Sequence, residues 1–493
     1  MCGRRPAIIL LSVALVLGSL ILYAAFQLGD ICPEGGGRCT WAGAMNTLDY
    51  LRGKGSNGEG EPKEGDVTSA PAVGTATADK PVDPSCHGFP DMSNILLVMK
   101  TGASEAYSKI PTQMLTNLRC VSESNFLIFS DMAQSIAGQE IIDTLETVIP
   151  EVKEHQDFEL YHNQVACPID QETCNKGINV AKQGWALDKY KNIHMAEKAY
   201  ARNPGFDWYL YVDADTYVVW STLVEWLSRV DAKQKIYMGS VAMLGGFPFA
   251  HGGSGYLVSQ GMMAAMFDGK ENVANRFDQN ATGLCCGDAL FSMALKEETD
   301  VSVQNVWPTV NGEKPNTLSY EDSQWCQPLV TMHHIGSEEV SDFYEWECSR
   351  NYTQPVRIKD LYHQFIKPHL DDTRAEWDNL SDDIRYADRD ADGIDSTDDK
   401  YRFDNLSEVE QEAHDSATNC RAACLELEEC MQWRFHRNVC YMGRKIRHGN
   451  PIIPGDGDGE KMVSGWHKAR IAAWAKEHED CGEIQWPNVR TSN

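Results

Sequence analysis

The chain has 493 residues, of which 24% are charged, and its formal net charge at pH 7 is -28. A chain of this length holds two or more domains and a sizeable hydrophobic core. The strong negative charge argues against a nucleic-acid-binding groove, which needs a basic surface, but not against a nucleotide that a metal ion bridges to acidic side chains.

An apolar segment lies near the N-terminus. Residues 7–28 contain no charged side chain, and as a helix they would span about 33 Å, enough for the hydrocarbon core of a bilayer. Arg4 and Arg5 precede the segment, so the positive-inside rule keeps residues 1–6 cytoplasmic. A cleaved signal peptide would have a shorter apolar region and an Ala-x-Ala site. We therefore expect a type II signal anchor.

The cysteines and glycosylation sequons indicate the secretory pathway. Sixteen cysteines fit an oxidising compartment. Cys2 falls on the cytoplasmic side, and the remaining odd number requires at least one thiol that is free or paired with another chain. Four Asn-x-Ser/Thr sequons agree with exposure to the lumen. They begin at Asn280, Asn351, Asn379 and Asn405.

Residues 29–90 are rich in Gly, Pro, Ala, Glu and Lys and poor in residues that build a core. This composition predicts a flexible stem that holds a folded head away from the membrane. Cys32 and Cys39 either close a small loop or link two stems.

The first ordered elements read as strand, helix and strand. Residues 95–99 and 126–129 are short apolar runs, and residues 108–118 between them have helical spacing. This order predicts a right-handed βαβ unit and a parallel sheet, whose ligands lie beyond the carboxyl ends of the strands. Thr101 and Asp131 are therefore placed to meet a ligand, although Asp131 is equally suited to cap the next helix.

Two acids follow a third strand. Residues 208–212 are all aromatic or aliphatic and predict a strand buried on both faces, which runs into Asp213 and Asp215. Residues two apart in a strand point to the same side, and two carboxylates held so close favour a hard divalent cation that also binds phosphate oxygens. The alternative is a solvated turn.

Helical spacing extends over residues 185–200, where the apolar side chains predict core and the Asp and Lys side chains a solvated face. Thr222 and Glu225 have the spacing of a capping box for the helix that follows. Residues 235–241 read as another strand.

Three further groups carry chemistry. Residues 252–255, Gly-Gly-Ser-Gly, either let a backbone approach a ligand closely or form a tight turn. Asp288 precedes an apolar helical face and is either its N-cap or a general base. His333 and His334 lie in an apolar setting, as metal ligands or as core residues.

Together, the anchor, the stem, the Asp213-Ala214-Asp215 strand end, the Gly-rich turn, Asp288 and the His pair resemble glycosyltransferase family 31, in particular its fungal Fringe-like and core-1 β1,3-galactosyltransferase-like members. The resemblance covers residues 94–350. It implies a glycosyltransferase A-type fold, with a Rossmann-like mixed sheet flanked by helices. It also implies an inverting transfer from a UDP-sugar that depends on Mn²⁺.

The resemblance assigns a role to each candidate residue. Asp215 and one of His333 and His334, with His333 slightly favoured, would bind the metal, and Asp213 would lie by the donor ribose or the metal. Asp288 matches the catalytic base. The donor site would be formed by Thr101, Lys109, Asp131, Asp213, Gly252 and Gly253. The chain departs from the family pattern at Ala214, where an acid is usual, and at Cys285-Cys286.

The C-terminal third begins with an acidic stretch, residues 371–410. Its spacing of Asp388, Asp390, Asp392, Gly393 and Asp399 suits a calcium loop. However, Asp395 takes a position that prefers an apolar residue and flanking helices are missing, so an acidic linker is the better interpretation.

Residues 411–470 contain four cysteines, Cys420, Cys424, Cys430 and Cys440, which allow three connectivities. Their spacing resembles a PAN/apple module, a family that makes protein or carbohydrate contacts. The alternative is a disulfide-stapled cap on the catalytic domain, and residues 471–493 would form a tail.

These predictions describe an α/β Golgi membrane protein, single-pass and type II, with a lumenal catalytic domain at residues 91–370. We expect it to move a hexose or N-acetylhexosamine to a glycan or glycoprotein in β linkage, with β1,3 the expected position. A non-catalytic carbohydrate-binding or adhesion protein and a calcium-dependent surface protein are the alternatives.

Overall fold

The computed structural model describes residues 83–167, 170–453 and 461–490. The predicted cytoplasmic tail, the membrane anchor and most of the stem lie outside these residues. Within them, no helix combines the length and the apolar character needed to span a bilayer.

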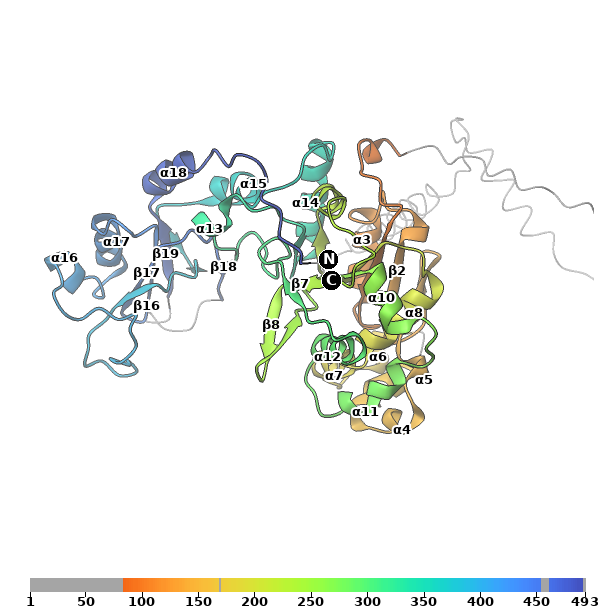
Figure 1. The fold of residues 1–493 in the computed structure, drawn as a ribbon. Helices are drawn as coiled ribbons and strands as arrows, with labels where there is room; N and C mark the ends of the chain where they lie inside the picture. Colours follow the sequence, from red (N-terminus) through yellow and green to blue (C-terminus); the bar gives the residue numbers. More distant parts are fainter. Residues whose placement is uncertain (1–82, 168–169, 454–460, 491–493) are drawn as a thin grey trace, which may run out of the picture. The chain divides into compact units, whose positions relative to one another are not determined.

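A mixed sheet of eight strands forms the core, in the order β11-β7-β10-β5-β1-β2-β4-β3 (Figure 1). β1 pairs in parallel with β2 and β5, and β10 runs antiparallel to β5 and β7. The predicted βαβ unit is confirmed, with α3 (Ala106–Leu115) between β1 and β2. The strands are β1 (Ile95–Lys100), β2 (Phe126–Ser130), β3 (Gln134–Ile136), β4 (Gln139–Asp143), β5 (Trp208–Asp213), β7 (Tyr237–Gly239), β10 (Tyr256–Ser259) and β11 (Gln304–Asn305).

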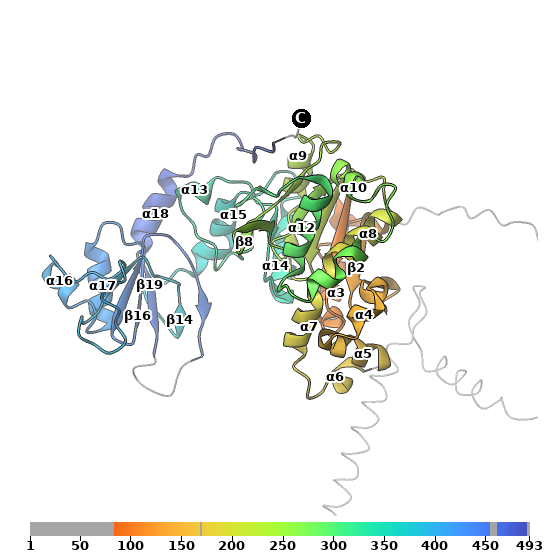
Figure 2. The same ribbon diagram turned by 60° about the horizontal axis from the view of Figure 1, so that its bottom comes forward.

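Helices cover both faces of this sheet (Figure 2). Alternate side chains of β1 enter different clusters: Leu97 packs with α3 and α9 (Trp220–Leu227), whereas Leu96 packs with the helices of the other face. Those helices are α8 (Lys191–Arg202), α10 (Gln260–Phe267) and α12 (Gly287–Thr299). Burial on both faces explains why β1, β2 and β5 are continuous apolar runs rather than alternating ones.

The remaining elements of the region around this sheet are short, except α14. They are α4 (Pro150–Lys153), α5 (Glu159–Ala166), α6 (Gln171–Cys174), α7 (Val180–Asp188), β6 (Tyr217–Val218), β8 (Val241–Leu244), β9 (Phe247–Ala250), α11 (Asp278–Ala281), α13 (Asp322–Trp325), β12 (Thr331–Met332), α14 (Ser337–Ser349) and α15 (Ile358–Leu361).

Three local predictions were wrong. Residues 185–200 form two helices, α7 and α8, rather than one. Thr222 does not cap α9, which begins two residues earlier, because its hydroxyl accepts a hydrogen bond from the N–H of Val356. Asp131 caps no helix, since the next element is the strand β3.

The C-terminal module is an antiparallel sheet of five strands, in the order β13-β19-β16-β17-β15, against which α17 (Ala417–Glu426) packs. Residues 371–410, predicted as a linker, supply β13 and β15, which pair with β19 and β17. The strands are β13 (Arg374–Ala375), β15 (Ile384–Tyr386), β16 (Gln432–His436), β17 (Val439–Gly443) and β19 (Val463–Trp466). Smaller elements are β14 (Trp377–Asp378), β18 (Asn450–Pro451), α16 (Glu408–Gln411) and α18 (Lys468–Glu477).

The disulfides settle one open question. Cys420 pairs with Cys440, and Cys424 with Cys430, which selects one of the three connectivities. Among the described cysteines Cys348 is free, in agreement with the odd count. The other pairs are Cys86–Cys120, Cys167–Cys174, Cys285–Cys286 and Cys326–Cys481.

The Asn379 sequon is not accessible in the folded protein. Its side chain is fully buried and donates hydrogen bonds to the carbonyls of Trp433 and Gly465. Asn280, Asn351 and Asn405 are exposed.

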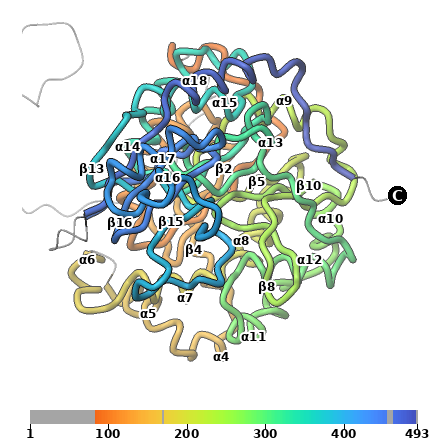
Figure 3. The backbone as a smooth tube through the Cα atoms, turned by 90° about the vertical axis from the view of Figure 1, so that its left-hand side faces the viewer, coloured from red at the N-terminus to blue at the C-terminus, as the bar shows by residue number. Residues whose placement is uncertain are grey.

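The predicted tail returns to the region of the eight-stranded sheet (Figure 3). Trp486 packs against the cluster that contains α3 and α9, and the Arg229 guanidinium lies over its ring. Gln304 in β11 exchanges two hydrogen bonds with the backbone of Arg490, at 2.9 and 2.7 Å.

Candidate active site

The carboxyl ends of β1, β2 and β5 meet at one edge of the sheet. Lys100, the last residue of β1, is the register partner of Asp213, the last residue of β5. Thr101 and Asp131 follow β1 and β2 at the same edge, as predicted, and both are buried. The sheet topology therefore gathers charged and polar side chains from three strands.

Three of these side chains form a ladder of alternating charge with Asp188, at the end of α7, and Lys191, at the start of α8. Lys100 Nζ lies 2.5 Å from Asp188 Oδ2 and 3.3 Å from Asp213 Oδ1. Lys191 Nζ lies 3.6 Å from Asp188 Oδ1 and 3.7 Å from Asp131 Oδ2. We call Asp131, Lys191, Asp188, Lys100 and Asp213 the charge ladder.

Burial and charge act against each other along the charge ladder. Burial would lower the pKa of Lys100, but the carboxylates of Asp188 and Asp213 raise it, so the ammonium stays charged. Burial raises the pKa of Asp213, an effect that Lys100 reduces. The positive charge of Lys100 therefore offsets the electrostatic cost of holding the carboxylates of Asp188 and Asp213 close together in a partly buried position.

The sequence interpretation missed this ladder. It placed the Asp and Lys residues of residues 185–200 on a solvated face, yet Lys191 is only 2% exposed. Lys191 donates instead to the carbonyl of Thr101, at 3.1 Å. One feature of the sequence could have indicated the charge ladder. Lys100 is a charged residue at the end of a buried strand, at the edge of the sheet where ligands bind.

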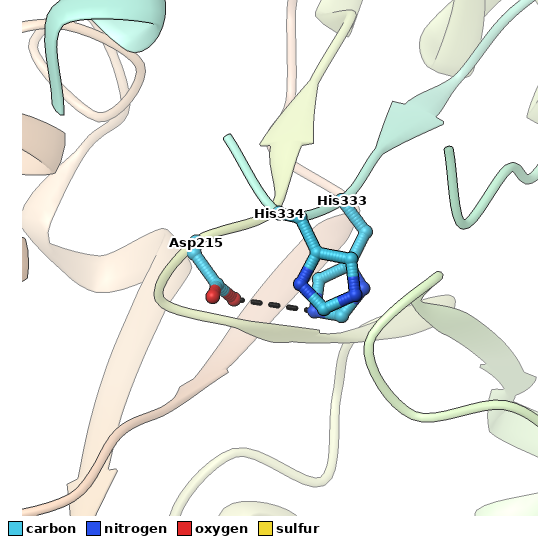
Figure 4. A group of neighbouring side chains, drawn as sticks. All are labelled: Asp215, His333 and His334. Atoms are coloured by element: carbon cyan, nitrogen blue, oxygen red, sulfur yellow. Dashed lines mark ion pairs between the residues drawn. The ribbon is translucent and has the colours of Figure 1, made fainter. Parts of the chain in front are cut away.

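A second group joins distant parts of the chain (Figure 4). Asp215, His333 and His334 each offer a ligand atom, and these atoms lie within 4.8 Å of one another. Asp215 Oδ1 is 3.3 Å from His333 Nε2. His334 has a φ of 60°, a left-handed conformation that brings two consecutive rings to the same side, with centroids 3.8 Å apart.

The backbone around this group is fixed by neighbouring elements. The N–H of Ile335 donates to the carbonyl of Asp215 at 3.0 Å, and β12 pairs with β6 directly beside both segments. From α3, the Gln113 amide donates to the carbonyl of Ala214 at 2.8 Å. The turn that carries Asp215 is thus held from two sides.

The donor set fits a divalent metal ion. Burial alone would raise the pKa of Asp215, but the hydrogen bond from His333 and the charge of Lys109, 3.2 Å away, bring it below its usual range. A carboxylate held ionised beside two imidazoles is a ligand set that divalent transition metals accept. His333 Nδ1 is also buried without a hydrogen-bond partner. Among the described residues, no other group of His, Cys, Asp or Glu has metal-ligand spacing.

Asp213 is not in this group, because its carboxylate lies against Lys100. Its role as a metal ligand stays a prediction. The calcium loop around Asp388 shows no such cluster among the described residues either.

The Gly-rich turn lets the two halves of the site approach. A Cβ on Gly253 would lie 2.1 Å from Cε1 of His333, so only glycine fits there. The Gly253 carbonyl accepts a hydrogen bond from the Thr216 hydroxyl at 2.7 Å. The predicted tight turn is present, because the N–H of Gly255 donates to the carbonyl of Gly252 at 2.9 Å and Gly255 has a φ of 83°. Close approach to a ligand stays a prediction.

Asp288 is in the first turn of α12 but is not its N-cap, which is Cys286. Its Oδ2 accepts from the N–H of Gly252 at 2.7 Å, and its Oδ1 accepts from the N–H of Ala289 at 2.8 Å. These bonds fix the orientation of a half-buried carboxylate and leave further lone pairs on both oxygens. The N-cap alternative is therefore wrong.

His251 was not assigned a role from the sequence. Its ring centroid lies 5.7 Å from that of His333, and its Nδ1 hydrogen-bonds to the Ser254 hydroxyl at 2.8 Å. Burial lowers the pKa of His251. Its position directly before the Gly-rich turn was the signal that could have identified it.

A cavity of about 330 Å³ adjoins Asp215. It lies between α3 and the start of α14, and Lys109, Gln113, His334 and Ser337 are among its lining residues. A polar, half-open space beside a metal-ligating group can accept a charged ligand.

Part of the chain is similar to known proteins. A family model described as Fringe-like matches residues 92–297, which include Asp213, Asp215 and Asp288. No curated protein matches the chain. A solved structure described as a glycosyltransferase involved in the glycosylation of the major capsid of PBCV-1 is 11% identical. The match covers 51% of this chain and 99% of that one, with a TM-score of 0.22.

Proposed function

We propose that this protein, whose residues 92–297 form a Fringe-like domain of the glycosyltransferase family 31 type, transfers a hexose or N-acetylhexosamine from a UDP-sugar to a hydroxyl of a glycan or glycoprotein. The reaction would invert the anomeric centre, depend on Mn²⁺ and give a β linkage, with β1,3 the expected position. The observation that carries this proposal is the Asp215, His333 and His334 group.

Asp215, His333 and His334 would hold the manganese. When bound, the ion would supply positive charge that stabilises the diphosphate leaving group. Lys109, whose Nζ lies 3.2 Å from Asp215, adds a cation at the same place. The cavity beside Asp215 provides space for phosphate oxygens.

The donor would extend from the metal along the sheet edge. Thr101 and Asp131, which end β1 and β2, would line the uridine subsite, and Asp213 would lie by the ribose. The charge ladder joins these positions to one another, so the subsites would be held in a fixed relation.

Asp288 would be the general base. Its carboxylate takes the proton of the acceptor hydroxyl while that oxygen forms a bond to the anomeric carbon. The bond from the anomeric carbon to the phosphate oxygen breaks, and its electron pair leaves with UDP. The N–H groups of Gly252 and Ala289 orient the carboxylate throughout.

A Golgi location is part of the proposal. It is supported by the apolar segment at residues 7–28 and by the exposed sequons. The disulfides of the described residues also suit a lumenal catalytic domain.

The test is UDP release from UDP-galactose, UDP-N-acetylglucosamine and UDP-glucose with Mn²⁺. Asp215→Ala should abolish turnover with the preferred donor, because the metal loses its carboxylate. Asp342→Ala, an exposed acid on α14, is the matched control and should keep full activity. A folded wild-type protein with no metal-dependent turnover on any donor would contradict the proposal and favour a non-catalytic binding protein.

A further inference from the structure

Trp185 and Trp307 are the exposed tryptophans of the described residues, and Trp185 is the more exposed of the two, at 63%. Its indole ring contacts no other ring and no cation in the part of the chain that the structure describes. A single exposed apolar side chain is common on protein surfaces, so exposure alone indicates no site. The position of Trp185 beside the candidate active site is what distinguishes it.

Trp185 lies on α7, three residues before Asp188, which ends that helix. Side chains three residues apart in a helix are neighbours on one face, with their Cβ atoms about 5–6 Å apart. The direction of Asp188 is fixed, because its carboxylate lies 2.5 Å from Lys100 Nζ at the edge of the sheet. The indole therefore projects from the side of α7 that adjoins the carboxyl ends of the strands.

The start of α12 packs directly against the end of α7. A Cβ on Gly287 would lie 2.9 Å from the carbonyl oxygen of Asp188 and 2.9 Å from Cα of Lys189, so a larger residue would force the two helices apart. Asp288, the proposed general base, directly follows Gly287. Trp185 is thus one helical turn from Asp188, and Asp188 contacts the residue before the base.

The backbone at this place is held without a ligand. The adjacent residues Cys285 and Cys286 form a disulfide immediately before α12, which restricts the chain where the helix begins. The carboxylate of Asp188 is held by Lys100 and Lys191, and two backbone N–H groups orient the base. A preformed surface binds a ligand without the cost of ordering its own side chains.

Three groups are open to solvent next to one another. The Trp185 indole is exposed, the side chain of Asp188 is 33% exposed and Asp288 is half-buried. Burial raises the pKa of Asp188, but the charges of Lys100 and Lys191 bring it below its usual range. Asp188 therefore carries an ionised carboxylate, which accepts hydrogen bonds from hydroxyl groups.

This combination of groups matches a neutral sugar ring. A pyranose has C–H groups on its ring faces and hydroxyls at its edge, so an aromatic surface beside two hydrogen-bond acceptors suits it. A serine or threonine side chain of a polypeptide has no ring face to place on the indole. Two carboxylates, in a chain of net charge -28, also disfavour an acidic sugar, because like charges repel.

We propose that Trp185 is the platform on which the acceptor sugar packs, and that the acceptor is an uncharged pyranoside of a glycan. One face of the sugar ring would lie on the indole, one hydroxyl would donate to Asp188, and the reacting hydroxyl would give its proton to Asp288. This inference rests on the proposed function. It adds an acceptor subsite to the metal and donor subsites.

The experiment measures UDP release with Mn²⁺ and the preferred donor at increasing acceptor concentration. The acceptor probes are the methyl glycosides of galactose, glucose, mannose, N-acetylglucosamine and N-acetylgalactosamine, none of which carries a second ring. We expect Trp185→Ala to raise the KM of the active glycoside about tenfold. The KM of the donor and the hydrolysis of the donor without acceptor should not change. Trp185→Phe keeps an aromatic face and should recover most of the loss.

Two controls accompany these variants. Leu425→Ala removes another exposed apolar side chain, 45% exposed on α17 of the C-terminal module, and should leave every kinetic constant unchanged. The uronic acid counterpart of the active glycoside, which carries a carboxylate at C6, should have a KM at least about tenfold higher. Circular dichroism checks that each variant is folded.

Binding of the same glycosides can be followed without turnover, by saturation-transfer difference NMR in the presence of UDP. Signals from the C–H groups of the sugar ring should appear with the wild-type protein and with Leu425→Ala, and should be lost with Trp185→Ala. If no glycoside gives such signals with the wild-type protein, the acceptor subsite is wrong.

Failure of this inference and failure of the proposed function give different results. No UDP release from any donor, with or without an acceptor, contradicts the proposed function, and the NMR experiment then decides on the subsite. Three results would overturn the inference while the donor is still hydrolysed: no stimulation by any methyl glycoside, an acceptor KM that Trp185→Ala leaves unchanged, or a uronic acid that reacts as well as the neutral sugar.

Discussion

In the candidate site, the backbone of Gly253 lies directly against the His333 side chain. In Gly253→Ala the added methyl group would lie 2.1 Å from the His333 ring, so either the turn or the imidazole must move. A displacement of about 1 Å costs about a hundredfold in rate. We therefore expect UDP release and Mn²⁺ affinity, measured by electron paramagnetic resonance, to fall by that order with the fold intact.

Gly205→Ala is the control for this substitution, because nothing lies within 4 Å of a Cβ there. It should leave both measurements unchanged. If the two substitutions change UDP release and Mn²⁺ affinity equally, the close packing of Gly253 against His333 does not contribute to function.

Glu347 predicts a pH dependence of stability. Burial raises its pKa from an ordinary 4.5 to about 7, although the hydrogen bond from the Tyr217 hydroxyl opposes this. The folded protein thus binds more protons than the unfolded chain between these values. The free energy of unfolding falls as the pH rises from about 4.5 to about 7.

The glutamine in Glu347→Gln is neutral at every pH. Between pH 5 and pH 8 the free energy of unfolding of this variant should therefore fall by about 3 kcal/mol less than that of the wild-type protein. Urea denaturation at pH 5 and pH 8 measures it. The exposed Glu345 on the same helix provides the control Glu345→Gln, which should keep the wild-type slope. An unchanged slope in Glu347→Gln would show that the carboxyl is ionised in the folded state.

Single residues differ in how far the sequence predicted their places. Asp215 and Asp288 were identified because they follow a buried strand and precede an apolar helix. Lys100 and His251 were not, because neither belongs to a short motif. Lys100 and His251 matter because they contact segments that are distant in the chain. The hydrophobic periodicity of a sequence does not indicate such contacts.

At the scale of elements, the charge ladder links three strand ends and α8. Lys100→Met removes one cation and leaves Asp188 and Asp213 close together with too little positive charge. Breaking a fully buried ion pair costs about 3–5 kcal/mol. Because the carboxylates of Asp188 and Asp213 are 33% and 28% exposed, we expect a smaller loss, about 2 kcal/mol, in the free energy of unfolding from urea denaturation.

The control is Lys233→Met, whose side chain is 67% exposed and lies 3.4 Å from Asp207. An exposed pair contributes about 0–1 kcal/mol. Adding Asp188→Asn to Lys100→Met should recover part of the loss, because one unpaired charge is removed. A loss in Lys100→Met no larger than that of the control would contradict the ladder's role.

Elements buried on both faces were the ones that sequence predicted well. β1, β2 and β5 appear at their expected positions because continuous apolar runs of that length leave little choice. Boundaries set by tertiary contacts were missed. The start of α9 and the break between α7 and α8 depend on partners such as Val356 that no local pattern contains.

For the whole molecule, the return of the C-terminal segment is a stabilising contact that can be measured. Trp486→Ala removes a half-buried ring from the cluster around α9 and should cost about 1–3 kcal/mol in the free energy of unfolding. Hydrogen exchange at the backbone N–H of Arg490 should also quicken, because its acceptor, the Gln304 side chain, is lost when the segment is released.

Trp185→Ala is the control, because that ring is 63% exposed. It should change stability by about 0.5 kcal/mol or less. If Trp486→Ala leaves both the stability and the exchange at the Arg490 amide unchanged, the segment is not part of the folded domain.

At this scale the sequence predicted the α/β catalytic region and a separate cysteine-rich unit, but it assigned residues 371–410 and 471–493 to connecting segments. Acidic composition gave no indication that β13 and β15 enter the module's sheet. Such pairings depend on backbone hydrogen bonds, which any side chains can flank.

The return of residues 486–490 to β11 has a consequence for biosynthesis. The region around the eight-stranded sheet is synthesised before residues 486–490, yet one of its hydrophobic clusters and the Gln304 side chain take partners from them. Domains generally fold in order of synthesis. Here the packing of the earlier region is completed only after residues 486–490 have been made.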